Sequence, residues 1–338
     1  MNKLDLIFTV IFVIATVILI YFYNKRHALV EEHEYDDFIS KGKRRGIKRY
    51  FCKDCKTSFS SKRRPEKLEK IIFEEYFLHR QTLKQLSAKY DKSIPWIMKQ
   101  RDEYIVECKV HNPRPVNLIC DATFYGKRKD KLGTLVFKDN ESKEILIWKH
   151  IESEVVKDYR YLKEKLIVLG YTIESTTLDG KRGLYKAFKD IPIQMCHFHQ
   201  KKIVQRYITM RPKLEAGKDL KKIVSRLTQT TEKNFTQKLD EWYETYQHFL
   251  EEKSISSTTG QLHYTHPRIR SAYRSLRTNL PYLFTYKNYK HLSISNTTNA
   301  LEGGVFSHMK NMISLHRGLS KSLKLNLVDY YLVNYKKK

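Results

Sequence analysis

The chain has 338 residues and carries 64 lysines and arginines against 37 acidic residues, which gives a formal net charge of +27. This length allows two or three domains, and the content of 30% charged and 12% aromatic residues excludes a low-complexity or disordered chain. The strong positive charge indicates a polyanionic partner, either nucleic acid or anionic lipid. Five cysteines in so long a chain exclude a disulfide scaffold and suit a reducing compartment.

The first predicted region, residues 1–37, combines an apolar segment with an acidic linker. Residues 6–23 contain no charge, and as a helix they would span about 27 Å, close to the thickness of a bilayer core. We therefore expect membrane insertion. Because the flank that follows is basic, the positive-inside rule places the rest of the chain in the cytoplasm, where the nucleoid lies. The alternatives are a buried core helix and an accidental start in an upstream reading frame.

The second predicted region, residues 38–64, is a basic arm with the pattern of half a zinc ribbon. Two short strands around a glycine turn lead into Cys52 and Cys55, whose spacing suits one side of a tetrahedral Zn²⁺ site. No cysteine lies upstream to supply the other two ligands. We expect a degenerate ribbon that contacts DNA, and zinc binding is the alternative. The predicted DNA contacts of this arm are Lys43, Arg44, Arg45, Lys48 and Arg49.

The third predicted region, residues 65–112, contains three short helices. A threonine cap at Thr82 starts the second helix, and Ser93 caps the third, which has Pro95 in its first turn. A short helix, a tight turn and a third helix with Lys99 and Arg101 are typical of a helix-turn-helix that contacts DNA. An ordinary three-helix bundle is the alternative.

The last predicted region, residues 113–338, has the element order β-β-β-α-β-α-β-α, which predicts an α/β (α+β) fold with a mixed sheet flanked by helices. Asp121 and Asp179 lie at the predicted C-terminal ends of strands, where open sheets place their sites. Glu302 is the only acidic residue from Lys253 to Val328, and it lies beside an apolar helical stripe. A carboxylate in that position needs a cation, and Mg²⁺ would meet that need.

One further stretch, residues 266–291, interleaves six lysines and arginines with aromatic residues. Such a stretch suits stacking on unpaired bases at a DNA end, with Arg270 and Arg274 among the contacts. A solvated surface is the alternative.

Four motifs together resemble a known family: KGKRRGIKRYFCKDC, ICDATF, TLDG followed by CHFH, and TTNALEGGVFSHMK. From about residue 38 onward, the chain resembles bacterial insertion-sequence transposases of the Mutator-like DDE group, although the first cysteine pair is missing. The resemblance implies an RNase H-like core in which Asp121, Asp179 and Glu302 hold two Mg²⁺ or Mn²⁺ ions. It also implies a helical insertion at about residues 201–293. The family's Cys-x2-His corresponds to Cys196 and His199 beside the active site, although a packed thiol and a buried imidazole explain this pair equally well.

The function implied by the resemblance is that of a DNA transposase, which cleaves the ends of an insertion sequence and joins them to target DNA. Its partner would be double-stranded DNA, bound by a homodimer or a larger assembly because two ends are processed together. A second hypothesis is a catalytically inactive, membrane-tethered DNA-binding protein derived from a transposase, motivated by the apolar start and the incomplete ribbon. A third is an RNase H-like nuclease without strand transfer.

Overall fold

The computed structural model of the chain describes residues 38–44, 47–53, 58–60, 68–181, 183–255, 258, 260–316 and 318–335. The chain divides into two units, Met1–Ile71 and Ile72–Lys338. The predicted apolar segment, residues 6–23, lies outside the described residues. Within the residues that are described, no helix has both the length and the apolar character needed to cross a membrane.

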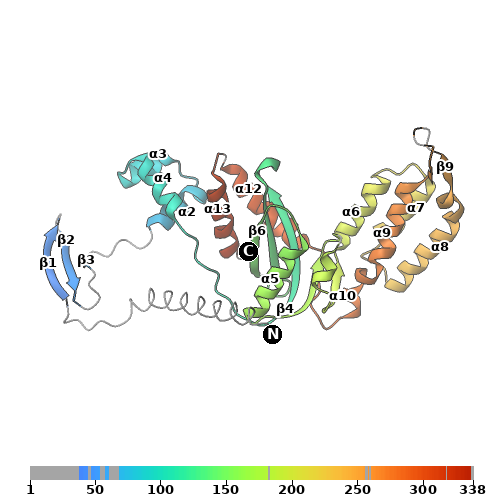
Figure 1. The fold of residues 1–338 in the computed structure, drawn as a ribbon, viewed down its shortest axis with the longest axis horizontal. Helices are drawn as coiled ribbons and strands as arrows, with labels where there is room; N and C mark the ends of the chain where they lie inside the picture. Colours follow the sequence, from blue (N-terminus) through green and yellow to red (C-terminus); the bar gives the residue numbers. More distant parts are fainter. Residues whose placement is uncertain are drawn as a thin grey trace, which may run out of the picture. The chain divides into compact units, whose positions relative to one another are not determined.

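The first unit contains a small antiparallel sheet with the strand order β1-β2-β3 (Figure 1). Its strands are β1 (Phe38–Arg44), β2 (Ile47–Cys52) and β3 (Ser58–Ser60). Lys43 and Lys48 are cross-strand partners and both are exposed. The two predicted strands are therefore confirmed. Cys55 and Arg45 lie outside the described residues, so zinc binding stays a prediction.

The second unit is built around a mixed five-stranded sheet with the order β6-β5-β4-β7-β8. Its strands are β4 (Pro115–Tyr125), β5 (Leu132–Asp139), β6 (Ile145–Ile151), β7 (Thr172–Leu178) and β8 (Ile193–Met195). Strand β5 runs antiparallel to both of its neighbours, β4 and β6, and β7 and β8 run parallel to β4. This arrangement confirms the predicted mixed sheet and is consistent with an RNase H-like core.

Helices cover both faces of this sheet, so every residue of β5 is buried. Helix α5 (Val156–Val168) packs on one face through Tyr159 and Leu162, which join a core with Phe137. The other face is covered by a second group of helices (Figure 1). These are α11 (Asn299–Leu301), η4 (Glu302–Phe306), α12 (Ser307–Leu315) and α13 (Lys321–Val333).

The segment from α11 to α12 buries the apolar stripe expected from the sequence, because Leu301, Val305 and Met309 are all inaccessible to solvent. The middle of this segment, η4, is a π-helical turn that contains one residue more than an α-helical turn would. Glu302 is the first residue of this wider turn. Turns of this kind occur often at functional sites.

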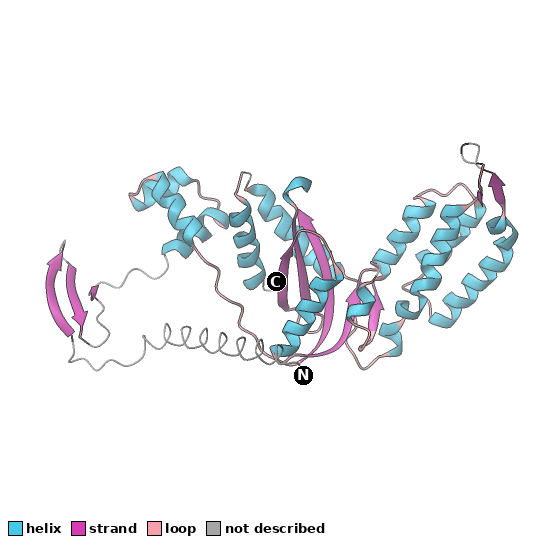
Figure 2. Cartoon of the chain, in the orientation of Figure 1, coloured by secondary structure: helices cyan, strands magenta, loops and turns pink. Residues whose placement is uncertain are grey.

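Residues 197–288 form a mostly helical region with its own apolar core, which includes Leu220, Phe235 and Leu276 (Figure 2). The helices are α6 (His197–Ile208), α7 (Glu215–Ser225), α8 (Glu232–Glu251), α9 (Pro267–Leu283) and α10 (Thr285–Asn288). A two-stranded ribbon of β9 (Lys253–Ile255) and β10 (Leu262–Tyr264) follows α8. Short helical turns elsewhere are η2 (Arg128–Asp130) and η3 (Leu184–Ala187).

The three predicted short helices are present as α2 (Leu68–Phe77), α3 (Leu83–Tyr90) and α4 (Ile94–Glu103). The predicted cap at Thr82 is confirmed, because the Thr82 hydroxyl accepts from the Gln85 backbone N–H and the Gln85 side chain accepts from the Thr82 N–H. The Asp91 backbone, with φ of 49°, forms the tight turn before α4.

The helices α2, α3 and α4 are attached to the C-terminal helix α13 by a small aromatic core. Phe73 and Phe77 pack with Leu327 and Tyr330, and the Tyr330 hydroxyl donates to Glu74 Oε1 over 2.8 Å. This contact ties the three helices to an element that also covers the five-stranded sheet.

Candidate metal-binding site at the edge of the sheet

Asp121 lies within β4 rather than at its end, which corrects the prediction from the sequence. The strand continues to Tyr125 because its last residues pair with β5, from Asp121↔Val136 to Tyr125↔Leu132. Its pairing with β7, however, ends at Ile119. Asp121 therefore stands just beyond the neighbouring strand, and its side chain is only 6% exposed. Because side chains alternate along a strand, Asp121 points to the same face as Ile119, the face covered by α11 and α12.

Glu302 and His199 reach this position from two helices. Glu302 begins the π-helical turn η4, and His199 lies in the first turn of α6. The imidazole Nε2 of His199 and Oε1 of Glu302 are 3.0 Å apart, and both side chains are partly buried. The predicted need of Glu302 for a cation is therefore met in this structure by a histidine.

Asp121, His199 and Glu302 form one group, in which one ligand atom from each lies within 4.8 Å of the other two. Burial raises the pKa of Asp121 to about 7, and the charges of Asp179 and Glu302 act in the same direction while His199 opposes them. Burial alone would lower the pKa of His199, but Cys196, Asp121 and Glu302 together raise it to about 9. The imidazole is thus a cation at neutral pH and donates a hydrogen bond to Glu302.

Asp179 lies immediately after β7, as predicted, but it is not a member of this group. Its Oδ1 accepts a hydrogen bond from the backbone N–H of Lys181 at 3.0 Å. Burial raises the pKa of Asp179, and the nearby charge of Glu154 raises it further. Asp179 is close enough to raise the pKa of Asp121 as well. Its role as a metal ligand stays a prediction.

Glu154, which the sequence analysis did not identify, lies in the connection before α5 and holds two partners. Its Oε1 accepts from the Tyr159 hydroxyl at 2.5 Å, and its Oε2 lies 2.9 Å from the Lys181 ammonium. Lys181 therefore joins Glu154 through its side chain and Asp179 through its backbone. No sequence motif marks Glu154, and only the sheet topology reveals that its connection lies beside the end of β7.

The other predicted member of the site, Cys196, is fully buried and packs behind His199. Its sulfur accepts a hydrogen bond from the backbone N–H of Thr298, three residues before Leu301, at 3.3 Å. Thr298 Oγ1 is also 3.5 Å from Nδ1 of His199. Cys196 and Thr298 thus support the orientation of His199 from the side opposite Glu302.

The residues predicted to contact DNA outside the arm differ in what they present to solvent. Lys99 and Arg274 are exposed. Arg101 is only 6% exposed, pairs with Asp102 and stacks on the Tyr76 ring, so the structure gives it a packing role, and a DNA contact through it stays a prediction. Arg270 stacks over the Tyr264 ring at 3.6 Å and donates to the carbonyl of Leu250, so its guanidinium is largely engaged.

Comparison with known proteins gives little further guidance. No family model matches the sequence, and no curated protein matches it. Among solved structures, the chain is similar to the Drosophila P element transposase strand transfer complex, with a TM-score of 0.37 and 11% identity over 80% of this chain and 93% of that chain. A TM-score this low carries no argument, so the interpretation of the site depends on its geometry.

Proposed function

We propose that the chain is a metal-dependent DNA transposase of the Mutator-like DDE group. The observation that supports this proposal most strongly is the convergence of Asp121 and Glu302, which are far apart in the sequence, at one edge of a mixed sheet. In a chain with a net charge of +27, two acidic side chains brought together in this way suit the binding of a divalent cation next to a phosphodiester.

The residues present fit such an ion. Asp121 and Glu302 supply the carboxylate oxygens that Mg²⁺ and Mn²⁺ prefer, and Asp179 would supply a further oxygen from the connection after β7. A bound divalent ion would supply Lewis-acid stabilisation of the phosphoryl oxygens. Because the pKa of His199 is raised to about 9, this residue can become a ligand only after losing its proton.

The protein's own residues would then have distinct tasks. Asp121 and Glu302 would supply the negative charge that binds the divalent ion. The pairing of His199 with Glu302 reduces the repulsion between these two carboxylates. The exposed lysines of the arm and Lys99 of α4 would bind the phosphates of the element end. Strand transfer would place a second DNA at the same edge of the sheet.

The test is an Asp121→Asn variant, which preserves the size of the side chain and removes its charge. We expect loss of DNA cleavage and strand transfer by about 100-fold or more, with DNA affinity nearly unchanged. Calorimetric titration with Mn²⁺ should show weakened ion binding in the absence of DNA. Asp219→Asn, on the surface of α7, is the matched control and should behave as the wild type.

Cleavage by Asp121→Asn at the wild-type rate would contradict the proposal. Unchanged Mn²⁺ binding by the same variant would reject the metal site itself.

A further inference from the structure

The hairpin of β4 and β5 extends past the metal-binding edge and carries an aromatic side chain that is partly open to solvent. Phe124 follows Asp121 by three residues, which is about 10 Å along a strand, and it is 44% exposed. Because side chains alternate along a strand, Phe124 points to the face opposite Asp121, the face that carries α5, and its exposed ring offers a surface for stacking there.

The Phe124 ring packs over Gly133, its cross-strand partner on β5. A Cβ atom at Gly133 would lie 2.6 Å from Cε1 of Phe124, which is closer than any real contact. The ring therefore lies directly against the backbone of β5. Any side chain at Gly133 would displace it, whereas glycine leaves the ring flat on the hairpin with its outer part open to solvent.

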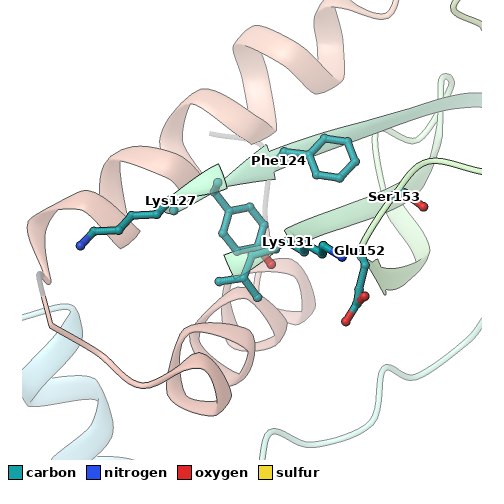
Figure 3. Close-up of a pocket in the computed structure, with 8 residues that line it drawn as sticks. Phe124, Lys127, Lys131, Glu152 and Ser153 are labelled. Carbon is teal, nitrogen blue, oxygen red and sulfur yellow. The ribbon is translucent and has the colours of Figure 1, made fainter. Parts of the chain in front are cut away.

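Phe124 lines a hollow of about 630 Å³ that is large enough for a nucleotide (Figure 3). Lys131, Glu152 and Ser153 lie along the same hollow, and Lys127 extends away from Phe124 toward the other side of the hairpin. The Lys131 backbone has a φ of 46°, an unfavourable value for a residue with a side chain. Strain of this kind is often found where a side chain must be held for function.

A second hollow, of about 550 Å³, continues from the first one across the tip of the hairpin. It shares Lys127 with the first hollow and adds Lys310 from α12 and Lys324 from α13. The acidic residue in the first hollow, Glu152, lies 3.7 Å from Lys321. Both sides of the hairpin tip are therefore lined by ammonium groups, and this charge complements a phosphate backbone.

We propose that Phe124 stacks on an unpaired base of a DNA strand that passes over the hairpin of β4 and β5, while Lys131 and Lys127 bind the adjoining phosphates. Stacking suits this site because every base has an apolar face, so one exposed ring can hold any of the four. The inference rests on the proposed DNA-directed function, but it concerns binding alone and can be tested without catalysis.

The experiment measures binding of the full chain to two fluorescent twelve-nucleotide strands in EDTA, so that no metal-dependent step takes part. One strand is oligodeoxythymidine, and the other has the same phosphates with abasic sites in place of the bases. We expect the wild type to prefer the strand with bases. Phe124→Ala should reduce that preference by about five-fold or more, since stacking is worth at least that much per base.

Four further variants make the test specific. Phe124→Trp should retain the preference, and Phe124→Leu should lose it while still covering Gly133, which excludes a folding defect. Tyr161→Ala removes an aromatic ring of similar exposure from α5 and should change nothing. Lys131→Gln should weaken binding of both strands equally. It should also reduce the slope of log affinity against log salt concentration by about one, which corresponds to the loss of one phosphate contact.

Equal preference in the wild type and in both Phe124→Ala and Phe124→Leu would overturn the inference. That result would leave the proposed function intact, because cleavage is tested separately through Asp121.

Discussion

The two groups of titratable residues at the sheet edge differ in the kind of backbone that carries them. Asp121, Glu302 and His199 lie on a strand and two helices, and one ligand atom from each lies within 4.8 Å of the other two. Asp179 and Glu154 lie on connections, where they are linked to each other through Lys181. Sites on regular elements are held more firmly than sites on loops. The comparison suggests that the first group is formed in advance and that the second adjusts when a cation binds.

The largest effect is expected for Asp179→Asn, which tests whether the second group adjusts when a cation binds. If Asp179 becomes a ligand when the ion binds, cleavage should fall about 100-fold or more, as for Asp121→Asn, although the two residues are arranged differently in this structure. Cleavage assays at saturating Mn²⁺ check this expectation. A loss of less than about three-fold would show that Asp121, Glu302 and His199 act without Asp179.

A smaller effect is expected for Glu154→Gln, which removes the charge that holds Lys181 and with it the connection bearing Asp179. We expect a loss of about 10-fold, together with a higher Mn²⁺ concentration for half-maximal cleavage, because supporting residues typically contribute this much. Glu154→Asp should restore part of the activity. Glu152→Gln, two residues away, is the matched control for the metal dependence. An unchanged Mn²⁺ requirement in Glu154→Gln would show that Glu154 only packs against Tyr159.

The smallest effect concerns a region remote from the metal, where His316 after α12 lies 3.1 Å from the carbonyl of Phe77 in α2 and donates to it through Nε2. Burial lowers the pKa of His316 below its ordinary value of 6.5, and the charges of Arg80 and Arg101 lower it further. The neutral ring is the stabilising form. Its contribution is therefore complete above pH 6.5 and is lost as the pH falls below that value.

The melting temperature should therefore fall between pH 7.5 and pH 5 by more in the wild type than in His316→Gln. The difference between the two falls should be on the order of 1 °C, as measured by thermal unfolding. His308→Gln, at an exposed position on α12, serves as the control. The same pH dependence in the wild type and in His316→Gln would assign the effect to other groups.

The sequence predicted much of the fold because its patterns were local. The strands around Asp139, the cap at Thr82 and the buried stripe beginning at Leu301 all follow from spacing within one element, and the structure contains them. The end of β4 was misplaced because Asp121 ends the apolar run of residues 116–120, whereas pairing with β5 continues the strand to Tyr125. Pairing partners are not visible in the spacing of a single strand.

The candidate site was predictable only in part for the same reason. Asp121 and Glu302 could be identified because each is an unusual carboxylate in its surroundings. Nothing in the sequence shows that His199 pairs with Glu302, that Glu154 lies beside Asp179, or that Arg101 turns inward to Tyr76. Each of these contacts joins elements that only the complete topology brings together.

The π-helical turn that starts at Glu302 has a consequence for how this protein can vary. Removing one residue, such as Gly303, would return the segment to α-helical geometry with little rotation of the helix that follows, because the wider turn takes up the additional residue. Val305 and Met309 would then stay in the core, and the change would be confined to the turn that begins at Glu302. A single deleted codon would therefore separate the contribution of this turn from that of the Glu302 carboxylate.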